Sequence, residues 1–81
     1  LKKGVKTPGG HVEVHLNVEK GVISELAIFG DFFVNKDIEE LVEAIKGVEH
    51  REDAVLKRLE DLGSEQYFNN ISAKELLEAF F

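Results

Sequence analysis

The strongest constraint on the fold is a strict alternation of apolar and polar side chains in residues 11–19. Successive side chains of a β-strand point to opposite faces, so the pattern predicts a strand with one buried and one solvated face. The side chains predicted to point inward are those of Val12, Val14, Leu16 and Val18. Lys20-Gly21 then forms a two-residue turn signal, and the apolar-rich run Val22–Phe29 completes a β-hairpin.

A second turn signal, Thr7-Pro8-Gly9-Gly10, precedes this hairpin. Proline fixes φ and glycine tolerates unusual backbone angles, so the two residue types together favour a reversal of the chain. The signal predicts that Leu1–Lys6 is a frayed or edge strand beside the hairpin. The sheet would then hold two to three antiparallel strands.

The apolar period changes after Gly30 from two residues to that of a helix. The first helical stripe consists of Ile38, Leu41, Val42 and Ile45. Asn35 or Asp37 can cap this helix, and Gly47 is predicted to end it in a left-handed conformation that satisfies its last carbonyl groups.

Two further helices are predicted in the second half of the chain. One runs from about Arg51 to Leu62 and ends at Gly63, with Val55, Leu59 and Leu62 facing inward. The other begins at a capping box formed by Ser72 and Glu75, with Ile71 and Leu76 at the staple positions and Leu77 and Phe80 on its apolar face. Between them, residues 65–70 are predicted to form a tight turn that folds Tyr67 and Phe68 onto the core.

The order of these elements indicates an α+β fold, in which a small antiparallel sheet is followed by three helices packed on one of its faces. A chain of 81 residues has room for one core, so residues 1–81 are predicted to form a single domain. The chain contains no methionine and begins at Leu1, and we expect it to be a segment of a longer protein.

Composition excludes several classes of function. The chain has no cysteine, which removes disulfide, thiol and iron-sulfur chemistry and fits a reducing compartment, so we expect the cytoplasm. Its formal net charge of −6, without a basic arm, disfavours nucleic acid as a partner. No apolar stretch approaches the roughly 20 residues of a membrane span.

No set of residues has the pattern of a catalytic or metal site. His11 and His15 share one strand face but are separated by about 13 Å at ~3.3 Å per residue, too far apart to bind one ion. His50 stands alone before the second helix, where we expect a cap or surface residue. The carboxylate pairs fall on outward helix faces, so we predict neither a catalytic residue nor a metal ligand in this chain.

The run Phe29-Gly30-Asp31-Phe32-Phe33 places three aromatic side chains around a turn between sheet and helix. Adjacent residues point their side chains in different directions in most conformations, so Phe32 and Phe33 are not expected to enter the core together. Exposed aromatic side chains beside a turn are common in protein interfaces. Whichever of these phenylalanines faces out is therefore a candidate contact residue.

Taken together, these segments resemble the C-terminal accessory domain of bacterial-type lipoate-protein ligases. The resemblance covers nearly the whole chain. It rests on Gly10-His11-Val12-Glu13-Val14, Val18-Glu19-Lys20-Gly21-Val22-Ile23, Ile28-Phe29-Gly30-Asp31-Phe32-Phe33 before Asp37-Ile38 and Leu41, and Tyr67-Phe68 with Asn70-Ile71 ahead of Glu75-Leu76. The Gly-Asp-Phe-Phe run and the late Tyr-Phe pair are its more specific parts.

The resemblance implies an accessory role in an AMP-forming enzyme. In that family a larger catalytic domain binds lipoate, ATP and Mg, forms lipoyl-adenylate, and transfers the lipoyl group to a lysine of an acceptor protein. The small domain packs on this catalytic domain, supports the activation step and shifts as a rigid unit, here about a hinge expected near Leu1. The catalytic domain and its residues are absent from this chain, so this fragment alone is not expected to be an enzyme or to bind a cofactor.

The resemblance thus names the catalytic domain of the same ligase as the direct partner, with lipoyl-acceptor proteins as indirect ones. We expect the interface between the domains to involve Gly30, Asp31, Phe32 and Phe33, with Tyr67 and Phe68 as second choices. The alternative is a free-standing, non-catalytic protein-interaction module. An iron-sulfur scaffold would combine similar elements but needs the cysteines that this chain lacks.

Overall fold

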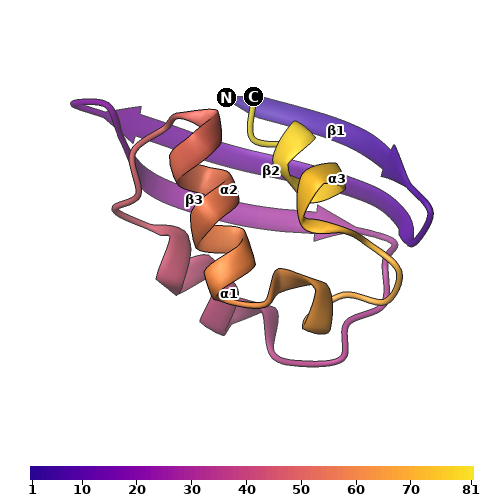
Figure 1. The fold of residues 1–81 in the computed structure, drawn as a ribbon. Coiled ribbons are helices and arrows are strands. Elements are labelled where there is room, and N and C mark those ends of the chain that lie inside the picture. Colours follow the sequence, from indigo (N-terminus) through magenta and orange to yellow (C-terminus); the bar gives the residue numbers. More distant parts are fainter.

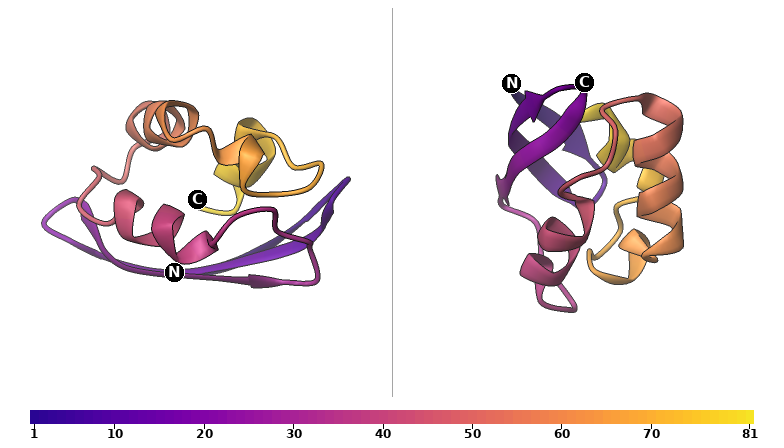
Figure 2. Two further views of the ribbon diagram at one scale, coloured as in Figure 1. Left: turned by 90° about the horizontal axis from the view of Figure 1, so that it is seen from below. Right: turned by 90° about the vertical axis from the view of Figure 1, so that its left-hand side faces the viewer.

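The computed structural model describes residues 1–81 as two layers, a three-stranded antiparallel sheet and a layer of helices on one of its faces (Figures 1 and 2). The elements in chain order are β1 (Lys2–Thr7), β2 (Gly10–Glu19), β3 (Val22–Gly30), α1 (Ile38–Ile45), α2 (Glu52–Asp61), the short 3₁₀ helix η1 (Ser64–Gln66) and α3 (Ala73–Glu78). The predicted α+β class, with three strands followed by three α-helices, is confirmed. No helix has the length and apolar character needed to cross a membrane.

Both predicted turns connect neighbouring strands of the sheet, whose order is β1-β2-β3. Lys20 and Gly21 have positive φ angles of 52° and 80° and join paired residues Glu19 and Val22. Two such residues in succession give a turn whose twist matches that of the flanking strands. Pro8-Gly9 is also a two-residue connection, between the paired residues Thr7 and Gly10, but without positive φ angles at its two residues, and the first residues form the expected edge strand.

A bulge in the hairpin changes the predicted alternation. Asn17 pairs with Glu25 and Val18 with Ile23, so Ser24 has no partner in β2. The extra residue shifts the phase of β3, and Ile23 and Leu26, three positions apart, are both buried. The prediction that Val18 points into the core is wrong, because this side chain is 41% exposed. It lies two residues before the Lys20-Gly21 turn, and the tip of this hairpin projects beyond the helix layer (Figures 1 and 2).

The helix starts follow the predicted caps. Asp37, one of the two predicted candidates, caps α1, because its Oδ1 accepts a hydrogen bond of 3.0 Å from the Glu39 backbone. Ser72 and Glu75 form the predicted capping box of α3.

The end of α1 differs from the prediction. Gly47 does have a positive φ of 91°, but its N–H donates to the carbonyl of Ile23 in β3 instead of to a helix carbonyl. The Lys46 N–H bonds to the carbonyl of Val42. Gly47 therefore returns the chain to the sheet, where Val22 and Glu49 form an isolated bridge.

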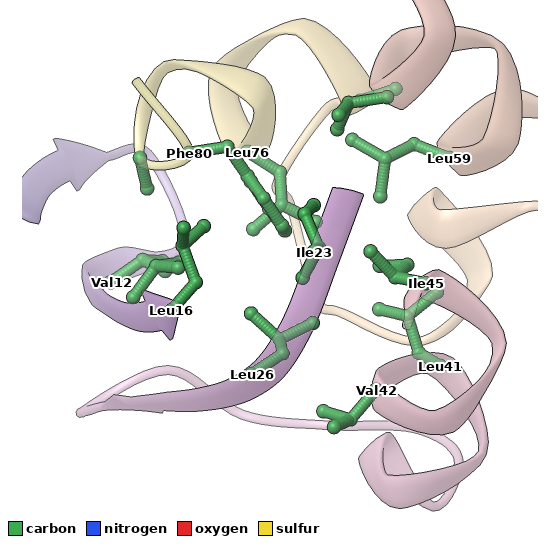
Figure 3. Packing of buried hydrophobic residues seen from close by; sticks show 14 of the residues in the cluster. Val12, Leu16, Ile23, Leu26, Leu41, Val42, Ile45, Leu59, Leu76 and Phe80 are labelled. Carbon is green, nitrogen blue, oxygen red and sulfur yellow. The ribbon is translucent and has the colours of Figure 1, made fainter. Parts of the chain in front are cut away.

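The core lies between the two layers. Val12 and Leu16 of β2 and Ile23 and Leu26 of β3 point toward the helices (Figure 3). They meet buried aliphatic and aromatic side chains from all three helices and from the C-terminal segment, namely Leu41, Val42, Ile45, Val55, Leu59, Leu76 and Phe80. Each such side chain contributes about 1.5–3 kcal/mol by leaving water. Leu62 and Leu77, predicted to face inward, are only partly buried at the margin of this cluster.

Candidate functional site

Three segments that are far apart in the sequence meet at one end of the sheet, and we call them together the loop end. They are the turn of residues 7–10, the loop of residues 30–37, and the segment of residues 67–71. Val34 and Phe68 form an isolated β-bridge between the second and third segments. The structure thus brings together the two groups of candidate contact residues, Gly30–Phe33 and Tyr67–Phe68.

Gly30 and Asp31 hold the start of the loop against β2. The Asp31 carboxylate Oδ1 accepts a hydrogen bond of 2.7 Å from the backbone of His11, and the Asp31 N–H donates to the His11 carbonyl at 3.2 Å. A Cβ at Gly30 would overlap that same carbonyl oxygen. Only glycine therefore permits the close approach that continues strand pairing one residue beyond β3.

Phe32 anchors the loop to the core. Its ring is partly buried and meets the ring of Phe68 edge to face, with centroids 5.0 Å apart. Phe68 itself is 1% exposed, among the largest fully buried side chains of the molecule. An edge-to-face pair of this kind adds roughly 0.5–1.5 kcal/mol to the burial of the rings. Phe32 is thus the phenylalanine of the adjacent pair that faces inward.

Phe33 is the phenylalanine that faces out, and it is 74% exposed. Its backbone is nevertheless fixed, because its carbonyl accepts a hydrogen bond of 3.0 Å from Asn69. Two residues later the N–H of Asn35 donates to the carbonyl of Tyr67 at 2.8 Å. Val34, between these two bonds, is also exposed at 47%. The loop therefore presents two apolar side chains to solvent on a backbone held at both sides.

Tyr67 and Phe68 are buried, and their backbones pair with the loop that carries Phe33 and Val34. The Lys36 ammonium lies 4.6 Å from the centroid of the Tyr67 ring, within cation–π range. Both aromatics fold onto the core as predicted, but in place of one tight turn over residues 65–70 the segment contains the end of η1 and the bridge of Phe68 to Val34. Their participation in an interface stays a prediction, and their burial assigns them to the support of the exposed residues.

The turn of residues 7–10 closes the loop end. A Cβ at Gly9 would overlap the backbone oxygen of Asn69 and the side chain of Ile71. Gly10 has a φ of 126°, which non-glycine residues rarely adopt, and lies against Asp31 and Phe32. The glycines of this turn therefore let β1 and β2 approach the other two segments.

Phe29 and Val34 are exposed apolar residues in or beside the run of candidate residues, but the predicted contact set does not include them. Phe29 is 53% exposed on the face of the sheet that the helices leave open. Its position could have been found, because it follows the inward-facing Ile28 in the alternation of β3. Val34 carries no such signal, since its exposure depends on the bridge to Phe68, a contact distant in sequence.

The histidines do not form a reactive cluster. On the open face, His15 Nε2 donates to the Glu13 carboxylate at 2.8 Å, and this bond holds the pKa of Glu13 below its ordinary value. No three histidine, aspartate or glutamate side chains gather as a metal site would require. His50 is neither a helix cap nor a free surface residue: it is partly buried, its Nε2 donates to the Phe80 carbonyl at 2.7 Å, and its ring stacks on Phe81.

Comparisons with known proteins agree on one family. The family model described as bacterial lipoate protein ligase C-terminus matches residues 1–80. The chain is 31% identical over 81 residues to the lipoate-protein ligase LplJ of Bacillus subtilis, covering 100% of this chain and 24% of that protein. It is 37% identical over 73 residues to a lipoate-protein ligase of Streptococcus pyogenes, covering 90% of this chain and 22% of that protein. The chain thus spans about a quarter of the length of these relatives.

A solved structure shares the fold. It comes from an archaeal lipoylation system, described as a bi-partite lipoate protein ligase and its E2 lipoyl domain from Thermoplasma acidophilum. The TM-score is 0.85 at 18% sequence identity, and the match covers 100% of this chain and 93% of the solved one. At this identity the likeness extends to the fold alone.

Proposed function

The chain belongs to the family of bacterial lipoate-protein ligase C-terminal domains, and on this premise we propose that it is the accessory domain of an ATP-dependent lipoate-protein ligase. In this role it packs on the catalytic domain and supports formation of lipoyl-adenylate. The lipoyl group then passes to a lysine of an acceptor protein. ATP, Mg and lipoate bind in the catalytic domain, and this chain holds none of them.

The observation that carries the proposal is the exposure of Phe33 and Val34 on a backbone fixed by hydrogen bonds to Asn69 and Tyr67. Exposed apolar side chains on a fixed backbone lose little conformational entropy when a partner covers them. Aromatic anchors of this kind carry a large share of the binding energy in many protein interfaces. The loop end therefore has the properties of a preformed docking surface for the catalytic domain.

The proportions of the relatives support a partner of this kind. About three quarters of the length of the curated ligases lies outside the part that this chain matches. The archaeal ligase that shares the fold is itself described as bi-partite. Domains of one chain commonly bury about 600–1,500 Å² against each other through fairly polar interfaces, which suits a small apolar centre within a polar rim.

The test is to restore activation by adding the domain as a separate chain. A ligase of this family is shortened so that its C-terminal domain is missing, and lipoate-dependent ATP–pyrophosphate exchange is measured with and without the 81-residue chain. We expect exchange to rise with the concentration of added chain until it saturates. Failure of the chain to raise exchange at any concentration would count against the accessory role.

Two matched variants test whether the added chain raises exchange through its loop end. Val34→Ser at the loop end and Val18→Ser at the hairpin tip make the same substitution on side chains of similar exposure at opposite ends of the sheet. We expect Val34→Ser to require a higher concentration for the same exchange, and Val18→Ser to behave as the unmodified chain. Equal behaviour of the two variants would remove the loop end from the interface.

A further inference from the structure

The exposed apolar side chains of this molecule are not spread evenly over its surface. The large apolar residues that solvent reaches freely are Leu1, Val18, Phe29, Phe33 and Val34. Each lies in a strand, directly before β1, or in the loop that follows β3. None belongs to a helix, so the apolar surface is confined to the sheet and the loop end.

The helices present the opposite kind of surface. Every exposed residue of α1, α2 and α3 carries a charge, and together they are Glu39, Glu40, Glu43, Glu52, Asp53, Lys57, Arg58, Glu60, Asp61, Lys74 and Glu78. Covering such a surface would require each charge to lose water or find a partner. The helix layer is therefore suited to remain in solvent.

The open face of the sheet has a low apolar centre. Cross-strand pairing places Gly4, Glu13 and Phe29 in one row across the three strands, and Ala27 in the row beside it. The His11 ring lies over Gly4, but Ala27 has only a small side chain, so a partner surface can approach the sheet at Ala27, in the row next to the Phe29 ring. Phe29 is 53% exposed, and none of the helices covers this face (Figure 2).

The Phe29 ring is held in place by its neighbours. The ring of His15 meets it edge to face with centroids 5.0 Å apart, and His15 in turn donates to Glu13. The Glu13 carboxylate is thus already paired within the domain, and the other charged residues of this face, Lys2, Lys6 and Glu25, lie outside the row of Gly4, Glu13 and Phe29. Burying the exposed half of Phe29 against another protein would remove further apolar surface from water, and Glu13 would keep its hydrogen bond.

We propose that the domain docks with the open face of its sheet turned toward the catalytic domain, with Phe29 at the centre of the contact. The inference rests on the proposed function and adds an orientation to it. The sheet lies between its own helices and the catalytic domain, and the helices stay in solvent. The interface runs from Phe33 and Val34 at the loop end onto the open face.

The catalytic domain is the occupant that the proportions favour. The relatives carry about three quarters of their length outside this domain, which is ample to cover one face of a three-stranded sheet. A second copy of this chain would need a complementary apolar surface, and every exposed residue of α1, α2 and α3 is charged. Self-association through two open faces is an outcome that the test distinguishes.

The absence of cysteine from the chain allows a direct test of orientation. His11→Cys places one thiol on the open face, in the central strand, and Lys57→Cys places one on the outer side of α2; both native residues are exposed. Each variant is treated with a thiol-alkylating reagent, alone and with saturating catalytic domain, and alkylation of this chain is followed by mass spectrometry. We expect the catalytic domain to slow alkylation at position 11 by about tenfold or more and to leave position 57 unchanged.

The contribution of Phe29 to the binding affinity is measured by titrating Phe29→Ser with the catalytic domain, with Val18→Ser as the control. We expect about tenfold weaker binding for Phe29→Ser and an unchanged affinity for Val18→Ser, with thermal melts that show both variants folded at the temperature of the titration. Binding with protection at position 57 and not at position 11 would overturn the orientation and leave the accessory role standing. Protection of position 11 in the chain alone would assign the open face to self-association, and absence of any binding would remove the orientation and the accessory role together.

Discussion

The two ends of the sheet are built in different ways. At the hairpin tip, Lys20 and Gly21 form the turn through their own positive φ angles, and no atom lies within 4 Å of a Cβ added to Gly21. At the loop end, added Cβ atoms on Gly9 and Gly30 would overlap the backbone of other segments. The tip depends on local conformation, whereas the loop end depends on contacts between residues far apart in the chain.

The difference indicates where function is to be sought. An exposed side chain at a locally formed turn, such as Val18, needs no explanation beyond the end of the core. Phe33 and Val34 are exposed although three segments converge to fix the backbone that carries them. Several independent contacts that hold apolar side chains outward are expected for a surface that binds another protein.

The largest expected effect comes from removing the support of the loop end. Phe68→Ala deletes a fully buried ring that also packs against Phe32, so we expect a loss of about 3–5 kcal/mol in the free energy of unfolding. Urea denaturation measures this loss. Hydrogen exchange on a folded fraction should show faster exchange at residues 31–36, while the amides around Lys20 and Gly21 remain unchanged. Equal acceleration at both ends would show that the loop end is not a separate unit.

A pair of glycine substitutions compares the ends directly. Gly30→Ala forces a methyl group into the His11 carbonyl, and we expect about 2–3 kcal/mol of destabilisation. Gly21→Ala meets only the strain of a φ of 80°, for which about 1 kcal/mol is expected. Thermal melts of the two variants rank them. A larger loss for Gly21→Ala would contradict the contrast between contact-built and locally built ends.

A smaller effect is expected from the hydrogen bonds of side chains at the two ends. Asp31→Ala removes the acceptor of the His11 N–H, with an expected loss of about 1 kcal/mol. Ser24→Ala removes a longer and exposed bond of 3.2 Å to the Asn17 carbonyl at the hairpin bulge, and we expect no more than about half of that loss. Chemical denaturation of both variants decides whether side-chain hydrogen bonds stabilise the loop end more than they stabilise the hairpin tip.

The smallest effect on stability is expected from the hydrogen bond between His15 and Glu13, which lies on the open face between the two ends of the sheet. The hydrogen bond from His15 lowers the pKa of Glu13 from its ordinary value of 4.5, so this pair stabilises the fold above about pH 4.5. That contribution is lost as the pH falls through the lower pKa of the folded state. In urea melts between pH 3 and 6, Glu13→Gln should show a slightly shallower pH dependence than the unmodified chain. An unchanged slope would mean that the bond contributes nothing in solution.

Local sequence determined most of the fold. The alternation of residues 11–17, the Lys20-Gly21 turn, the apolar stripe of α1 and the capping box of α3 each involve residues close in sequence, and each prediction is confirmed. The bulge at Ser24 was not predictable, because either strand of a hairpin can accommodate an extra residue. Gly47 was assigned to the wrong partner for a similar reason: its N–H bonds to β3, which lies far from it in sequence.

The candidate site was predictable in part. The Phe32-Phe33 pair indicated that one ring faces out, but the choice between them depends on the packing of Phe32 against Phe68. Val34 is exposed and its backbone is bridged to Phe68. This pairing joins residues far apart in the sequence, so no local pattern predicts it. The prediction that Tyr67 and Phe68 lie on the core is confirmed, and the resemblance to ligases groups them with Gly30–Phe33, which Phe68 contacts through Phe32.

The most direct measurement of the central claim is the affinity of the catalytic domain for the chain carrying Phe33→Ser. Because Phe33 is largely exposed, this variant should melt at the temperature of the unmodified chain, with a change of no more than about 0.5 kcal/mol in the free energy of unfolding. Calorimetric titration should then show binding weakened by about tenfold or more. An affinity equal to that of the unmodified chain would contradict the assignment of the loop end as a docking surface.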